Sequence, residues 1–274
     1  MQTQLTKFST YLLVRRGLAD YTIHGYVGSI RRFLSEATIC PSADQIESYV
    51  ASMYTNKFSY SHIVNTSLAI ERYMEFIGSP LKLGRPRKPR RIIIATLSEA
   101  EIARLIGATK NIRERTILAL LAYSGIRAKE LCQLLVCDVD FASQSLNIRN
   151  GKGAKDRSVC IPPECSALVM EYLQAHPRSS ESCLFTTLQQ NHKYHTGDLR
   201  KLVRVVAARN SINRRVYPHL FRHSLATNML NRGAGLITIQ QQLGHVFLET
   251  TMIYLHQALR KTRNEYQMYV PNYI

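Results

Sequence analysis

A basic, proline-containing stretch at residues 79–95 divides the chain and predicts a fold made of two parts. From Lys82 to Arg91 it holds six basic residues, two prolines and no acidic residue. Proline has no amide donor and a fixed φ angle, so this stretch favours an extended conformation over a helix. Cations along an extended chain suit a row of phosphates. A solvated linker is the alternative, and the position of this stretch between two parts that we expect to bind a polyanion favours phosphate contact.

Four short helices are predicted before this stretch. Residues 20–34 carry apolar side chains at helical spacing, which is typical of a helix with one buried face. Ser42 and Gln45 form a capping-box pattern that begins the third helix, and Gly17 and Gly78 end the first and fourth. Four helices in about 80 residues indicate a small all-α domain.

The rest of the chain predicts more helices and one hairpin. Ser98 and Glu101 form a second capping-box pattern, and a helix rich in Leu and Ala follows from Asn111 to Ser124. Residues 145–149 and 157–161 predict two strands joined by a Gly-Lys-Gly turn. The predicted fold class is therefore mainly α with a small β-sheet (α+β).

The charge balance indicates a polyanionic partner. Lys and Arg number 36 and Asp and Glu 19, a net charge of +17, and nucleic acid fits this excess best. The sequence contains no apolar run of membrane-spanning length and no signal segment at its start. We therefore expect a cytoplasmic, nucleoid-associated protein with reduced cysteines. The C-x4-C pairs Cys132/Cys137 and Cys160/Cys165 are spaced more widely than usual zinc knuckles, so no metal site is predicted.

Residues 218–254 contain the side chains best suited to phosphate chemistry. His219 and Arg222 are three residues apart and share a helix face. A guanidinium offers forked donors that suit phosphate oxygens, and a phenol such as Tyr254 can attack phosphorus to form a covalent intermediate. Together these groups indicate phosphoryl transfer to tyrosine.

The motifs in this region resemble those of the tyrosine recombinases, the phage-integrase and Xer class. The resemblance rests on H-L-F-R-H at 219–223, L-G-H at 243–245, a tyrosine nine residues later, and Y-S-G-I-R-A-K-E-L at 123–131. The catalytic set that it implies is Arg127, Lys152, His219, Arg222, His245 and Tyr254, with Glu130 and His223 in supporting positions.

The resemblance also implies a mechanism and a domain organisation. Tyr254 would form a 3′-phosphotyrosyl link, two arginines and His245 would stabilise the phosphorane, and Lys152 would protonate the leaving oxygen. Lys155 is the rival to Lys152, and the G-K-G context favours Lys152. No metal or cofactor would be needed. Residues 1–80 would form a core-binding domain, 81–95 a basic linker, and 96–274 the catalytic domain.

The expected partners are duplex DNA with inverted binding sites and further copies of the chain, four in the synaptic complex. The residues predicted to contact DNA are Arg85, Arg87, Lys88, Arg90, Arg91, Lys155, Arg200, Lys201 and Arg204. The predicted function is site-specific recombination that integrates, excises or resolves a DNA element. A type IB topoisomerase and a non-catalytic DNA-binding regulator are the alternatives, and a binding protein would have no use for Tyr254.

Overall fold

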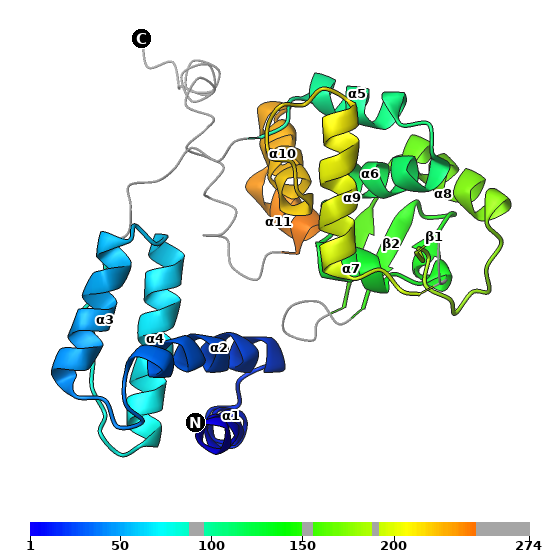
Figure 1. Cartoon of the computed structure of the whole chain (residues 1–274). Helices are drawn as coiled ribbons and strands as arrows, with labels where there is room; N and C mark the ends of the chain where they lie inside the picture. The colour runs from blue at the N-terminus through cyan, green and yellow to red at the C-terminus, as the bar shows by residue number, and fades with distance from the viewer. Residues whose placement is uncertain (88–95, 150–155, 188–191, 245–274) are drawn as a thin grey trace, which may run out of the picture. The chain divides into compact units, whose positions relative to one another are not determined.

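A computed structural model describes residues 1–87, 96–149, 156–187 and 192–244. Contacts between residues divide the chain into two compact units, Met1–Ile92 and Ile93–Ile274. Helices dominate both units, and the second also contains a small antiparallel sheet. The predicted fold class is confirmed (Figure 1).

The first unit consists of four helices: α1 (Gln2–Arg16), α2 (Asp20–Glu36), α3 (Ala43–Thr55) and α4 (Tyr60–Phe76). The predicted capping box at the start of α3 is present, because Gln45 N–H donates to Ser42 Oγ and Ser42 N–H donates to Gln45 Oε1. Helix α2 buries Ile30 and Phe33 from its apolar stripe. With Phe8 and Tyr73 they form the core of the bundle.

The chain after α4 returns to this bundle before it reaches the prolines. The N–H of Leu83 and the guanidinium of Arg85 both donate to the carboxylate of Glu71, at 2.8 and 2.6 Å. Leu81 and Leu83 pack against the apolar core. Arg85 and Arg87 are both exposed, but Arg85, predicted to contact DNA from an extended linker, is held in an ion pair with Glu71 of the first unit.

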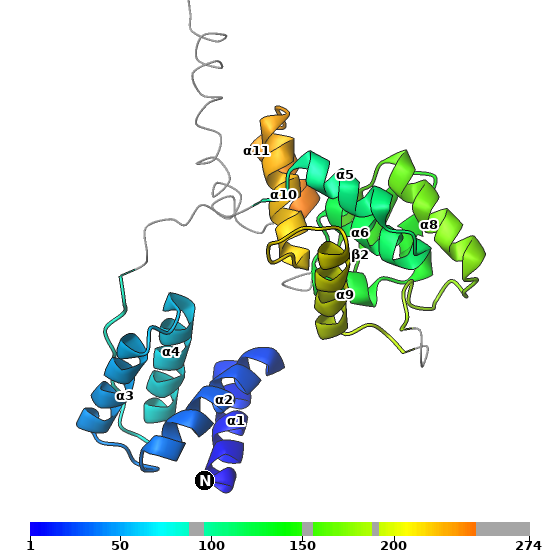
Figure 2. The same cartoon turned by 45° about the horizontal axis from the view of Figure 1, so that its top comes forward.

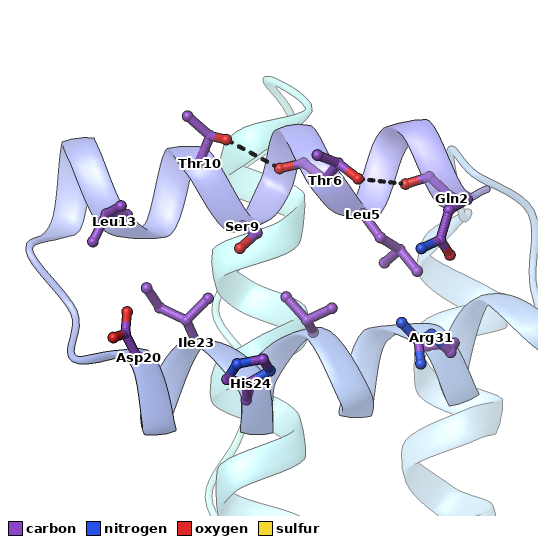
Figure 3. Close-up of a pocket in the computed structure, with 11 residues that line it drawn as sticks. Gln2, Leu5, Thr6, Ser9, Thr10, Leu13, Asp20, Ile23, His24 and Arg31 are labelled. Carbon is purple, nitrogen blue, oxygen red and sulfur yellow. Dashed lines mark hydrogen bonds between the residues drawn. The ribbon is translucent and has the colours of Figure 1, made fainter.

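A groove runs between α1 and α2 (Figure 3). Asp20, His24 and Arg31 line it from α2, and Thr6 and Thr10 line it from α1. Both threonine hydroxyls donate to main-chain carbonyls one turn earlier in α1. The predicted catalytic residues that the structure describes, Arg127, His219 and Arg222, do not line this groove.

The second unit packs around one buried helix. Its helical elements are α5 (Glu99–Ala108), α6 (Ile112–Ser124), α7 (Ala128–Gln133), the short 3-10 turn η1 (Val136–Asp138), α8 (Pro163–Ala175), α9 (Thr196–Arg209), α10 (Pro218–Asn231) and α11 (Leu236–Leu243). Helix α6 is in contact with α5, α8, α9 and α10 (Figures 1 and 2). Burial on nearly every side explains why α6 is rich in Leu and Ala around its whole circumference.

The sheet of the second unit has the order β1-β2-β3 and is antiparallel throughout. Strand β2 (Ser145–Ile148) pairs with β3 (Arg157–Cys160), so that Ile148 lies opposite Arg157. These are the two predicted strands of the hairpin. Strand β1 (Val139–Asp140) was not predicted, because two residues are too few to show an alternating pattern. Strand β3 forms one edge of the sheet and lies next to α11.

Candidate functional site

Arg127 is placed by a tight turn between α6 and α7. Gly125 ends α6 in the left-handed conformation, with φ of +63°, and Arg127 caps the start of α7. A Cβ atom at position 125 would lie 2.7 Å from Cδ2 of Leu243 and 2.9 Å from Cδ2 of Leu225. Only glycine combines this φ angle with so close an approach. The turn therefore fixes where Arg127 leaves α6.

Glu130 binds Arg127 at both its backbone and its side chain. One carboxylate oxygen accepts from the backbone N–H of Arg127 at 2.9 Å, and the other accepts from its guanidinium at 2.7 Å. The Arg127 side chain remains 22% exposed, so part of the guanidinium faces outward. A second guanidinium nitrogen donates to the carbonyl of Gly244 at 3.2 Å.

Arg157, which sequence analysis placed only in a strand, is the second cation on Glu130. Its guanidinium donates to both carboxylate oxygens, at 2.9 and 2.8 Å. Burial raises the pKa of Glu130, but hydrogen bonds from Arg157 and Arg127 outweigh this effect and lower the pKa to about 2. Glu130 is therefore a buried carboxylate that is ionised at neutral pH and binds two arginines.

Arg222 comes to the same place from α10. Its side chain is only 4% exposed, and its guanidinium donates to the carbonyls of Gly125 at 2.7 Å and Leu243 at 2.6 Å. Arg127 thus donates to the carbonyl of Gly244 and Arg222 to that of Leu243, two adjacent residues at the end of α11. The fold brings together two cations that lie far apart in the sequence, which is an arrangement suited to an anion with several oxygens.

The two histidines of α10 differ in exposure. His219 is exposed, and partial desolvation followed by the charges of Arg222, Arg127 and Arg200 lowers its pKa. It is therefore mostly neutral at pH 7 and able to accept a proton. His223 is half-buried, and burial with the neighbouring His219 and Arg222 lowers its pKa as well. His219 is thus open to solvent, whereas His223 is partly enclosed.

Further cations lie on α9. Arg200, Lys201 and Arg204 are exposed on this helix, whereas Leu199 and Val203 are buried in the core. Arg200 is close enough to His219 to affect its pKa. The three cations therefore lie on the exposed side of α9, and Arg200 is the one that the structure shows near His219.

Several predicted residues lie outside the described residues, namely Lys88, Arg90, Arg91, Lys152, Lys155, His245 and Tyr254. The described chain nevertheless shows where two of these segments begin. Gly244 has a φ of +64°, and a Cβ there would lie 2.4 Å from Cδ and Nε of Arg157. In the sequence, Arg157 comes shortly after the segment that carries Lys152, and Gly244 directly precedes the segment that carries His245 and Tyr254.

The cysteines give no sign of a metal centre within the described ranges. Cys132 and Cys165 are buried, and desolvation raises the pKa of their thiols to about 11 and about 12. In the part of the chain that the structure describes, His, Cys, Asp and Glu side chains form no group of three that could hold a metal ion. Also among these residues, no helix is both long and apolar enough to cross a membrane.

Comparison with known proteins places this site in a family. The phage integrase family model matches residues 95–261. A tyrosine recombinase of Pseudothermotoga lettingae is 32% identical over 272 residues, which cover 93% of this chain and 94% of that protein. Tyrosine recombinase XerA of Pyrococcus horikoshii is 30% identical over 269 residues, covering 94% and 93% of the two chains.

Solved structures agree. The crystal structure of XerA recombinase has a TM-score of 0.58 and 30% identity, with 99% of each chain covered. The Tn1549 transposon integrase in complex with transposon right end DNA shares the fold at a TM-score of 0.74, with 16% identity and 98% and 99% coverage. The chain therefore belongs to the phage integrase family and is a tyrosine-type site-specific DNA recombinase.

Proposed function

We propose that this recombinase cuts and rejoins duplex DNA through a 3′-phosphotyrosyl intermediate formed by Tyr254. The observation that carries the proposal is that the guanidiniums of Arg127 and Arg222 donate to the carbonyls of two adjacent residues, Gly244 and Leu243, at the end of α11. Two fixed cations can stabilise the charge that develops on the non-bridging oxygens of a phosphorane. His245 follows Gly244 directly in the sequence, and we assign it to the same task.

The remaining chemistry is proton transfer. Attack by Tyr254 forms the phosphotyrosyl bond and breaks the bond between phosphorus and the 5′-oxygen, which leaves as a hydroxyl. We assign the proton donor to Lys152 and the acceptor of the phenol proton to His219, whose lowered pKa keeps its ring mostly neutral. The 5′-hydroxyl of a partner strand then attacks the phosphotyrosine, which releases Tyr254 and restores a phosphodiester.

We further propose the assembly and the DNA contacts. Strand exchange between two inverted sites would use four protomers. Residues 1–80 would act as the core-binding domain, 81–95 as the linker and 96–274 as the catalytic domain. The cations of the linker and of α9 would contact the DNA backbone, which places the protein on the nucleoid. Arg85 would contribute least, since Glu71 already neutralises it.

Replacement of Tyr254 by Phe tests the nucleophile. This change removes one oxygen and keeps the ring, so covalent attachment to a nicked trapping substrate should vanish while DNA affinity stays within about twofold of the wild-type value. Tyr266→Phe, in the same terminal segment, serves as the matched control and should form adducts normally. Adducts that persist in Tyr254→Phe but vanish in Tyr266→Phe would assign the nucleophile to Tyr266. Relaxation of supercoils without strand exchange by the wild type would favour a topoisomerase.

A further inference from the structure

The side-chain amide of Gln242 joins the last turn of α11 to the edge of the sheet. Its oxygen accepts from the backbone N–H of Cys160 at 3.1 Å, and its nitrogen donates to the carbonyl of the same residue at 2.8 Å. The nitrogen also lies 3.4 Å from the carbonyl of Ser124 at the end of α6. One side chain thus ties together α11, β3 and α6.

The Gln242 side chain makes hydrogen bonds to Cys160 of the kind that a neighbouring strand would make. Strand β3 lies at the edge of the sheet, and Cys160 exposes both its N–H and its carbonyl there. A carboxamide has the same donor and acceptor as a peptide group, so it can satisfy both. A leucine or methionine at this position could fill the space but could make neither bond.

The contact between Gln242 and Cys160 lies directly beside the carbonyls that accept hydrogen bonds from Arg127 and Arg222. Leu243, the next residue, accepts from Arg222, and Gly244 accepts from Arg127. On the other side, Cys160 lies on the same short strand as Arg157, which packs against Gly244 and binds Glu130. Any shift of the end of α11 against β3 would therefore move both acceptor carbonyls and, with them, both guanidiniums.

We propose that Gln242 is a positioning residue for recombination, because it sets the register of the α11 end and so the spacing of Arg127 and Arg222. This inference rests on the proposed function, since it assigns these arginines to the phosphorane. A displacement of about 1 Å in catalytic groups can cost about a hundredfold in rate, even when the altered residue is remote from the chemistry. Loss of the amide should therefore reduce the rate of cleavage more than the affinity for DNA.

The test is Gln242→Met in the full chain, with Gln241→Met as the control. Methionine matches glutamine in length and in helix propensity but forms neither bond with Cys160. Gln241 is the exposed neighbour on the same helix. Phosphotyrosyl adduct formation is measured in single turnover at saturating DNA, on a normal substrate and on one with sulfur at the bridging 5′ position. DNA affinity and far-ultraviolet circular dichroism are measured on the same samples.

We expect Gln242→Met to form adducts at least about tenfold more slowly on both substrates, with DNA affinity within about twofold and the helix content retained. The Gln241→Met rate should match that of the wild type. Rescue by the bridging sulfur would show that Gln242 acts through the proton donor, and a loss confined to affinity would show a DNA-binding role. Either result, or an unchanged rate, overturns the inference. If Gln242→Met does not fold, Gln242→Glu carries the same test, because it keeps an acceptor and loses the donor. Absence of adducts with wild-type protein would instead refute the proposed function.

Discussion

Glu130→Gln isolates the charge that anchors two arginines. Glutamine keeps the size and shape of glutamate and retains an acceptor for the backbone N–H of Arg127, but it removes the negative charge that faces Arg127 and Arg157. The change therefore imitates protonation of Glu130 while the surrounding structure stays in place. We expect loss of stability in the second unit together with loss of cleavage.

The magnitude follows from the pKa of Glu130. Its ordinary value is 4.5 and the folded value is about 2. At about 1.36 kcal/mol per pKa unit, the ionised form contributes roughly 3 kcal/mol to the free energy of unfolding at pH 7. Because the folded pKa is depressed, this contribution is fully present above pH 4.5 and is lost as the pH falls toward 2. By pH 3 the difference between wild type and Glu130→Gln should shrink to roughly 1.4 kcal/mol.

Two buried cysteines, whose thiols become open to labelling only on unfolding, allow the stability of the second unit to be measured separately from that of the first. Cys165 is fully buried there and Cys132 is 5% exposed, whereas Cys40 of the first unit is exposed. Urea titration of the full chain at pH 7, with pulse labelling of Cys132 and Cys165, should show the variant less stable by roughly 3 kcal/mol. Circular dichroism extends the comparison to pH 3. A stability difference that stays constant between pH 7 and pH 3 would refute the argument, since it could not arise from ionisation of Glu130.

Three other perturbations test separate parts of the site. Gly244→Ala forces a side chain into a left-handed backbone position and against Arg157, so cleavage should fall at least about tenfold, whereas Gly107→Ala, a helical glycine with open space around it, should cleave like the wild type. Lys152→Ala should cleave a normal phosphate very slowly and a bridging 5′-sulfur substrate at nearly the wild-type rate, because a thiol with a pKa of about 8.5 leaves without an acid. If the sulfur substrate rescued only Lys155→Ala, the proton donor would be Lys155. Replacing Arg87, Lys88, Arg90 and Arg91 by Gln should lower the slope of the logarithm of the DNA-binding constant against log salt by about 0.9 for each phosphate that is no longer neutralised. Arg85→Gln should have a smaller effect because Arg85 forms an ion pair with Glu71. An unchanged slope would mean that the linker does not contact phosphate.

Local signals in the sequence were sufficient for most of the helices. The capping boxes at Ser42 and Ser98 are both present, and Gly17 and Gly125 end their helices in the left-handed conformation. Such features depend on neighbours within one turn of the chain, which is why spacing alone reveals them. The Arg127–Glu130 pair could be predicted for the same reason.

Long-range partners could not be predicted in this way. Arg222 binds the carbonyls of Gly125 and Leu243, and every residue has a carbonyl, so side-chain identity gives no signal. Arg157 and Gln242 looked like an ordinary strand residue and an ordinary helix residue, since their partners lie elsewhere in the sequence. Arg85 appeared free to contact phosphate because Glu71 lies 14 residues earlier in the sequence, inside α4.

The dependence of both arginines on Leu243 and Gly244 also affects when the protein becomes active. A nascent chain that has not yet reached residue 243 already contains Arg127, Glu130 and Arg222, but it lacks the two carbonyl acceptors. Such a chain would attract DNA through its charge without presenting the two guanidiniums in their final geometry. Under the proposed role of Tyr254, which is made later still, the ability to break DNA would arise only after most of the second unit has been synthesised. Incomplete copies of the chain would then bind DNA without cutting it.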